Sequence, residues 1–344
     1  MRTLRAVILL LMVLPGACRG LVIDHTCTDL SQLPYAWIDS VQANCRMHYC
    51  HTSHGSQLSI GAQTISDTSA VYGFADDWCE LPTQPGAFCV HDGQVDNDYI
   101  TPDLYWQTSG GMNTTRQVLT ANPSLNYGMW GWCTQLDYYD SLQVAEYLDS
   151  MAALEAEFPG VTFVYMTGNA QDSSEGGWNR HQRNEQIRAH CQSADRVLFD
   201  FADLDCWHDG GQHLVSAGGH VFPAEHPHYN GDEAAHTTVE SCVNKGRAWW
   251  WLMARLAGWP GPSGVAQGAA AVPAAAGFRV WPNPVRSLSQ LRFSRPGPYR
   301  VFNALGQLVA SGDGGALPDR PAPAGIYFVR AAGGGPCRRL VVIR

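Results

Sequence analysis

The chain has 344 residues, 45% of them hydrophobic, which allows about two domains with substantial cores. Acidic residues outnumber basic ones by 31 to 22, giving a formal net charge of -9. A surface of this sign repels phosphate backbones and no dense basic stretch interrupts it, so we expect no nucleic-acid partner.

Residues 1–20 have the organisation of a secretory signal peptide. Two arginines precede an unbroken apolar run, Ala6–Leu14, and Gly16 and Ala17 supply the small residues that signal peptidase requires. The run is too short to cross a hydrocarbon core of ~30 Å, and no later segment is long and apolar enough, so we expect no stable transmembrane segment. Cys18 follows directly, which leaves lipidation open.

Eleven cysteines fit export to an oxidising compartment. Nine of them lie between Cys27 and Cys242, so at least one is unpaired or bonds outside this set. No CxxC pair occurs, which argues against a zinc ribbon or a thioredoxin-like redox site. We expect structural disulfides, whose connectivity the sequence does not give.

Residues 21–259 alternate predicted strands and helices. The predicted elements are, in order, a strand at about Arg46–Cys50, an apolar strand within Asn126–Cys133, a helix over Ser141–Phe158, a strand at Val161–Met166, a helix around Glu185–Cys191, a strand at Arg196–Phe201 and a tryptophan-rich helix over Thr238–Leu256. This order predicts an α/β domain with a parallel sheet and right-handed crossovers. Ligands of such sheets bind beyond the carboxyl ends of the strands.

Composition changes sharply after Trp259. Residues 260–277 are almost entirely Pro, Gly, Ala, Ser, Val and Gln, which predicts a flexible linker. Residues 278–344 contain short alternating segments, such as Tyr299–Phe302 and Ile326–Val329, between Pro and Gly turns. This pattern is typical of a small antiparallel β-sandwich.

This tail resembles the C-terminal sorting domains of the type IX secretion system and related immunoglobulin-like tails. The matching stretches follow in order over almost the whole tail: Trp281–Pro284, Val301–Gln307, Pro323–Phe328 and Arg339–Ile343. The resemblance implies recognition by the type IX secretion machinery. Joined to the signal peptide, it implies passage through the periplasm to the cell surface or the medium.

The candidate nucleophile is a serine that follows the first predicted strand. Ser53 lies directly after that strand, and Ser56 three residues later. A serine at a tight strand-to-helix turn exposes its hydroxyl at the sheet edge beside free backbone N–H groups. Either serine also suits a helix cap, and we favour Ser53 as the nucleophile.

Two groups further along are candidate oxyanion donors. Gln135 follows the second predicted strand, and its carboxamide is suited to stabilising a developing negative charge. Gly111, in a predicted glycine turn, offers a backbone N–H. Asn169, after a later strand, is the alternative to Gln135, and a structural role for each of these residues remains open.

The candidate general base is His236, just before the last predicted helix. Glu233 or Asp232 would orient it, completing a serine–histidine–acid arrangement. Asp205 and His208, which have the same spacing directly after a strand, are the competing acid–histidine pair.

The order of these groups resembles the SGNH (GDSL-like) hydrolases, and more closely a divergent SGNH-like group of secreted bacterial proteins. The matching stretches span nearly all of residues 45–259: residues 51–57, 163–168, 198–204 and 250–259. The resemblance implies a flavodoxin-like three-layer domain that hydrolyses esters without a cofactor. An exported enzyme of this kind would act on an extracellular ester, such as an acyl group on a polysaccharide.

The chain departs from that family at three positions. Thr52 stands where an aspartate usually precedes the serine, Gln135 where an asparagine is usual, and Glu233 where the acid is usually aspartate.

Two other hypotheses follow from the composition. Twelve tryptophans allow a non-catalytic glycan-binding or surface module on the same scaffold, although those in the last helix should be core. Histidines between His208 and His228 are potential metal ligands in a metal-dependent hydrolase. Their spacing matches no metalloenzyme motif, so the sequence assigns no metal.

Overall fold

The computed structural model describes residues 20–262, 280–281, 283–293, 297–303, 307–312, 322–331 and 338–343. The predicted signal peptide, apart from Gly20, and the predicted linker, apart from residues 260–262, lie outside this part of the chain. Within it, no helix is long and apolar enough to cross a membrane.

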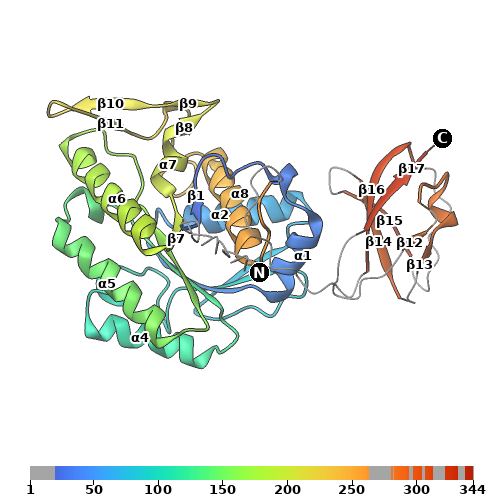
Figure 1. Ribbon diagram of the computed structural model, residues 1–344, viewed down its shortest axis with the longest axis horizontal. Helices are drawn as coiled ribbons and strands as arrows, with labels where there is room; N and C mark the ends of the chain where they lie inside the picture. Colours follow the sequence, from blue (N-terminus) through green and yellow to red (C-terminus); the bar gives the residue numbers. More distant parts are fainter. Residues whose placement is uncertain are drawn as a thin grey trace, which may run out of the picture.

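The first part of the chain is an α/β domain around a seven-stranded sheet (Figure 1). The sheet order is β1-β7-β6-β5-β2-β4-β3, and every neighbouring pair is parallel. The strands are β1 (Val22–Ile23), β2 (Arg46–His51), β3 (Phe74–Trp78), β4 (Phe88–Asp92), β5 (Tyr127–Gly131), β6 (Thr162–Met166) and β7 (Val197–Phe199). The prediction of a parallel α/β sheet is confirmed.

Helices cover both faces of this sheet, which makes three layers (Figure 1). One layer holds α1 (Tyr35–Asn44), α2 (Ser56–Thr68) and α8 (Val239–Leu256), and the other holds α4 (Ser109–Ala121), α5 (Ser141–Glu157) and α6 (Glu175–Ala194). Short helices α3 (Pro102–Tyr105) and α7 (Phe201–Cys206) lie in connections. Because both faces are covered, the central strands β5 and β6 are buried along nearly their whole length. Strands buried on both faces have nearly continuous apolar sequences.

Helices α2 and α8 pack backbone against backbone. A methyl group on Gly61 would lie 1.8 Å from the Cys242 carbonyl oxygen, and one on Gly246 would lie 2.4 Å from the Gly61 carbonyl carbon. Only glycine permits this approach. It anchors α8 over the sheet and so positions the loop that precedes α8.

Between α7 and α8 the chain forms small hairpins above the sheet. They are β8 (Trp207–His208) with β9 (Gly211–Gln212), and β10 (Leu214–Ala217) with β11 (His220–Pro223). The 3-10 turns are η1 (Leu30–Gln32), η2 (Gln135–Asp137), η3 (Pro227–Tyr229) and η4 (Leu288–Gln290).

A separate antiparallel sheet follows near the C-terminus, in the order β15-β14-β16-β17. Its strands are β14 (Tyr299–Asn303), β15 (Leu308–Gly312), β16 (Gly325–Ala331) and β17 (Arg338–Val342), and β12 (Val280–Trp281) pairs with β13 (Arg292–Phe293). These strands enclose a core of their own, which includes Val301, Val329 and Leu340.

Three expectations from the sequence need correction. The nine cysteines within the described residues are all free thiols, so no disulfide joins any two of them. The stretch expected to be a glycine turn is the first turn of α4, capped by Thr108. Trp130 and Trp132 are at most 1% exposed, so neither is available to stack on a sugar. The three tryptophans at 249–251 are at most 3% exposed, as expected for core residues of the last helix.

Candidate active site

The sheet changes direction between β2 and β5. From β2 the chain continues to β3 and then β4 on one side, whereas from β5 it continues to β6 and β7 on the other. Ligands of doubly wound sheets bind in the crevice outside the strand ends at such a point. Ser53 and His54 follow β2 here, and Cys133 follows β5.

A thiol and an imidazole meet at this edge of the sheet. Cys133 Sγ lies 3.1 Å from Nδ1 of His54, and Nε2 of His54 lies 2.7 Å from Oε1 of Gln171, which follows β6. His54 is 4% exposed and Cys133 is partly exposed. The tertiary structure therefore aligns Cys133, His54 and Gln171 from the ends of three adjacent strands.

The surroundings of Gln171 determine which nitrogen of His54 carries a proton. The amide nitrogen of Gln171 donates to the His236 carbonyl and to Oε1 of Glu225, 3.3 Å away. Since both groups accept, the amide oxygen must face His54, which then carries its proton on Nε2. In the neutral imidazole, Nδ1 is left as the acceptor that faces the thiol, which is the arrangement a general base requires.

This contact changes the pKa of both partners. Burial alone would raise the pKa of Cys133, but the hydrogen bond and charge of His54, helped by the hydroxyls of Thr52 and Ser53, lower it to about 6. Burial lowers the pKa of His54, but its hydrogen bonds to Cys133 and Gln171 and the thiolate charge leave it raised overall. Both shifts favour a thiolate beside an imidazolium, the reactive form of a cysteine.

Hydrogen bonds from Asn169 and Arg180 hold the loop that carries Cys133. Asn169 donates from Nδ2 to the Cys133 carbonyl at 2.7 Å. The Arg180 guanidinium, 2% exposed, pairs with Asp137 at 3.0 Å and donates to the Asp172 carbonyl at 2.7 Å. Arg180 thus joins the loops that follow β5 and β6, and this limits movement of the thiol relative to Gln171.

The predicted nucleophile, Ser53, lies beside the thiol. Its hydroxyl is 3.7 Å from Cys133 Sγ, and among the described residues it makes no hydrogen bond to a histidine. Ser56 donates its hydroxyl to the Ser53 carbonyl, as a turn residue does. The backbone N–H groups of Ser53 and His54 have no acceptor within the described residues, and they lie just before α2. They are suited to stabilising an oxyanion near the thiol.

His236 lies beside His54, but not as part of the predicted acid–histidine pair. Its ring centroid is 4.9 Å from that of His54. In the described part of the chain, neither Asp232 nor Glu233 is hydrogen bonded to its imidazole, and Glu233 instead accepts the Val239 N–H at the start of α8. The His236 carbonyl, by contrast, holds Gln171.

The two predicted oxyanion donors have other partners. Gln135 is buried, and its amide oxygen accepts the Cys133 N–H at 2.7 Å, so it shapes the loop that carries the thiol. The Gly111 N–H donates to Thr108 Oγ1 at 3.0 Å within the first turn of α4.

Asp205 does not form a pair with His208. It is ion paired with Lys245 at 2.7 Å, both side chains being 1% exposed. Asp205 also accepts the Ala170 N–H at 2.9 Å. Its charge, after burial itself, is the chief reason that the pKa of Glu225 is raised to about 7.

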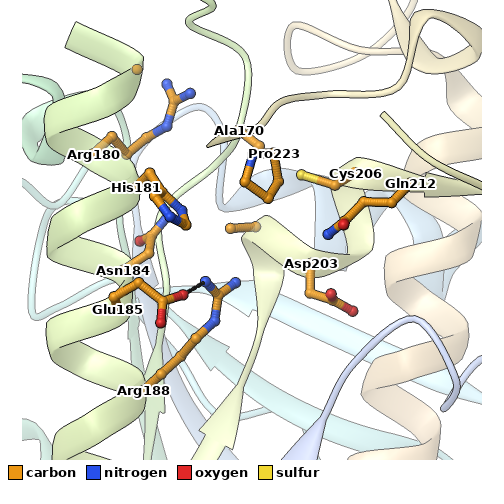
Figure 2. A pocket seen from close by; sticks show the side chains of 12 residues that line it. Ala170, Arg180, His181, Asn184, Glu185, Arg188, Asp203, Cys206, Gln212 and Pro223 are labelled. Atoms are coloured by element: carbon orange, nitrogen blue, oxygen red, sulfur yellow. Dashed lines mark hydrogen bonds and ion pairs between the residues drawn. The ribbon is translucent and has the colours of Figure 1, made fainter. Parts of the chain in front are cut away.

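A neighbouring pocket of about 230 Å³ lies between α6, α7 and the hairpins (Figure 2). Arg180, Asn184 and Arg188 line it from α6, and Asp203 and Cys206 line it from α7 on the opposite side. Arg188 is bound to Asp200 and Glu185, so its charge is already compensated. The pocket touches the loop after β6 at Ala170, and Cys133 and His54 do not line it.

Sequence reasoning missed Cys133, His54 and Gln171 as functional residues. Three features of the sequence pointed to Cys133 and His54. The count of nine cysteines between Cys27 and Cys242 is odd, and Cys133 directly follows a buried strand at the edge where chemistry was expected. His54 was next to the serine that was chosen.

We predict that His54→Ala slows alkylation of Cys133 by iodoacetamide at pH 6 by roughly 100-fold, because the thiol then returns to an ordinary pKa of about 8.5 or above. In the wild type the rate should rise with pH to a plateau above about 6. Mass spectrometry of the Cys133 peptide measures both rates, with Cys27 as an internal reference thiol. Equal rates in the two proteins at pH 6 would contradict the assignment.

The sequence matches no known family model and no curated protein. Among solved structures, an engineered protein aligns at 12% identity with a TM-score of 0.26, over 94% of this chain and 99% of that one. A Cellulomonas fimi endo-beta-1,4-mannanase double mutant aligns at 13% identity with a TM-score of 0.22, over 85% of this chain and 59% of that one. Scores this low carry no argument about fold or function.

Proposed function

We propose that the α/β domain is an exported SGNH-like ester hydrolase whose nucleophile is Cys133 rather than Ser53. The observation that carries the proposal is the contact of 3.1 Å between the Cys133 thiol and a His54 imidazole that Gln171 orients. A nucleophile, a base and a group that orients the base are the minimum for covalent acyl transfer.

The chemistry takes two steps. The Cys133 thiolate attacks the acyl carbon of the ester, and the Ser53 and His54 backbone N–H groups stabilise the oxyanion. The tetrahedral intermediate collapses as the His54 imidazolium gives its proton to the departing alkoxide, which leaves a thioester. His54 then takes a proton from water, the resulting hydroxide attacks the thioester, and the carboxylic acid and free thiol are released.

The substrate class proposed is an acylated extracellular polymer such as a polysaccharide. Tyr138 supports it, because this side chain is 68% exposed and lies near the thiol. Partial burial is the first cause of its raised pKa, and the charge of the Cys133 thiolate is the second. An exposed aromatic ring is suited to lie against a sugar. Export through the periplasm and recognition by the type IX machinery, both expected from the sequence, belong to the same proposal.

Trapping of the acyl-enzyme tests the proposal. The protein is incubated with p-nitrophenyl acetate, quenched in acid and digested, and the peptides are analysed by mass spectrometry. We expect one acetyl group per chain on Cys133, and none on that peptide in Cys133→Ala. Acetylation of Ser53 would restore the serine prediction, and absence of both an acyl-enzyme and ester hydrolysis would refute the hydrolase.

A further inference from the structure

Four imidazoles gather near the start of α8. His208 and His228 stack with ring centroids 3.6 Å apart, His226 lies 5.3 Å from His208, and His213 lies 6.0 Å from His226. They come from β8, η3 and the segments beside the hairpins. The polar loop that the sequence marked as a possible source of ligands therefore folds into one cluster.

A carboxylate from a third element completes a ligand set. Glu240, in the first turn of α8, lies 3.0 Å from His228 Nε2. One ligand atom from each of His208, His228 and Glu240 lies within 4.8 Å of the other two. Zinc and similar ions bind nitrogen and oxygen at about 2.0–2.2 Å, so small side-chain rotations bring the three atoms to one ion. Asp209, 3.5 Å from His208 Nε2, is available as a fourth ligand.

Hydrogen bonds hold the other two imidazoles of the cluster, His213 and His226, beside this set. His213 donates from Nδ1 to the Glu225 carbonyl at 2.9 Å, and His226 Nδ1 accepts the His228 N–H, so both rings are held in place around the pair. Such partners orient metal ligands.

We propose that His208, His228 and Glu240 form a binding site for a divalent transition metal of the zinc class. The ion would join β8, η3 and α8, and so brace the loop between η3 and α8. That loop holds Ala235 and His236 at φ values of 49° and 69°, a conformation that costs energy in residues other than glycine. It also supplies the carbonyls that hold Gln57 and Gln171. The site does not depend on the proposed hydrolase activity.

Cobalt titration of the chelator-treated full chain tests the site. Calorimetry should give about one ion per chain. The absorption spectrum of the bound cobalt should be that of nitrogen and oxygen ligands, with no thiolate charge-transfer band. Cys133→Ser should bind as the wild type does, which separates this site from the proposed nucleophile. The bound ion should also raise the melting temperature.

The variants separate this cluster from other surface histidines. His208→Ala and His228→Ala should each weaken binding more than ~10-fold, since even partners outside the coordination sphere contribute that much. Glu240→Gln, a change to a side chain that is 62% exposed, keeps the fold and should weaken binding too. His220→Ala, on exposed strand β11, is the matched control and should bind normally. No stoichiometric cobalt in the wild type, or normal binding by all three cluster variants, would overturn the proposal.

Discussion

Cys133→Ala should lower the rate of ester hydrolysis at least ~10³-fold, because it removes the atom that forms the acyl intermediate. Ser53→Ala should stay within about tenfold of the wild type, since the hydroxyl only donates a weak hydrogen bond to the thiolate from 3.7 Å. Steady-state hydrolysis of p-nitrophenyl acetate and of an acylated polysaccharide measures both. The comparison is sharp because the two side chains lie side by side at the same strand ends.

Circular dichroism of both variants checks that the fold is intact. The reverse result, an inactive Ser53→Ala beside an active Cys133→Ala, would identify the serine as the nucleophile. In that case His236, whose ring centroid lies 4.9 Å from that of His54, would be the candidate general base, as the sequence predicted.

The largest effect on stability is expected from Lys245→Met. Lys245 is the only lysine in the sequence, it is 1% exposed, and its ammonium lies 2.7 Å from Asp205. It also donates to Ser241 Oγ at 2.6 Å and lies 4.7 Å from the centroid of the Phe201 ring. Removing one partner leaves a buried carboxylate without compensation, so we expect a loss of about 3–5 kcal/mol in the free energy of unfolding.

Urea unfolding followed by tryptophan fluorescence measures this loss. Arg247→Met, on the exposed side of the same helix, is the matched control and should change stability by no more than about 0.5 kcal/mol. Adding Asp205→Asn to Lys245→Met should recover part of the loss, because it removes the unpaired charge. A loss below about 1 kcal/mol in the single variant would show that Asp205 finds other compensation.

The fold was largely predictable from the sequence where the buried side chains are apolar. The β5, β6 and β7 segments and helices α5 and α8 were expected within a few residues, because their apolar residues recur at the spacing of strands and helices. Helix α6 was expected to be shorter than its true span, Glu175–Ala194. Its buried positions do recur at helical spacing, but they include Arg180 and Asn184, which a pattern of apolar residues does not detect.

The sequence predicted the location of the candidate site but not the residues that form it. From the sequence alone we determined that chemistry belongs beyond the ends of the parallel strands, since that follows from the βαβ order. The tertiary structure decided which side chains meet there: Cys133 comes within 3.1 Å of His54, whereas Glu233 is occupied at the start of α8. The physical reason is that strand order and loop direction set distances between residues about 80 positions apart, and no local pattern encodes those distances.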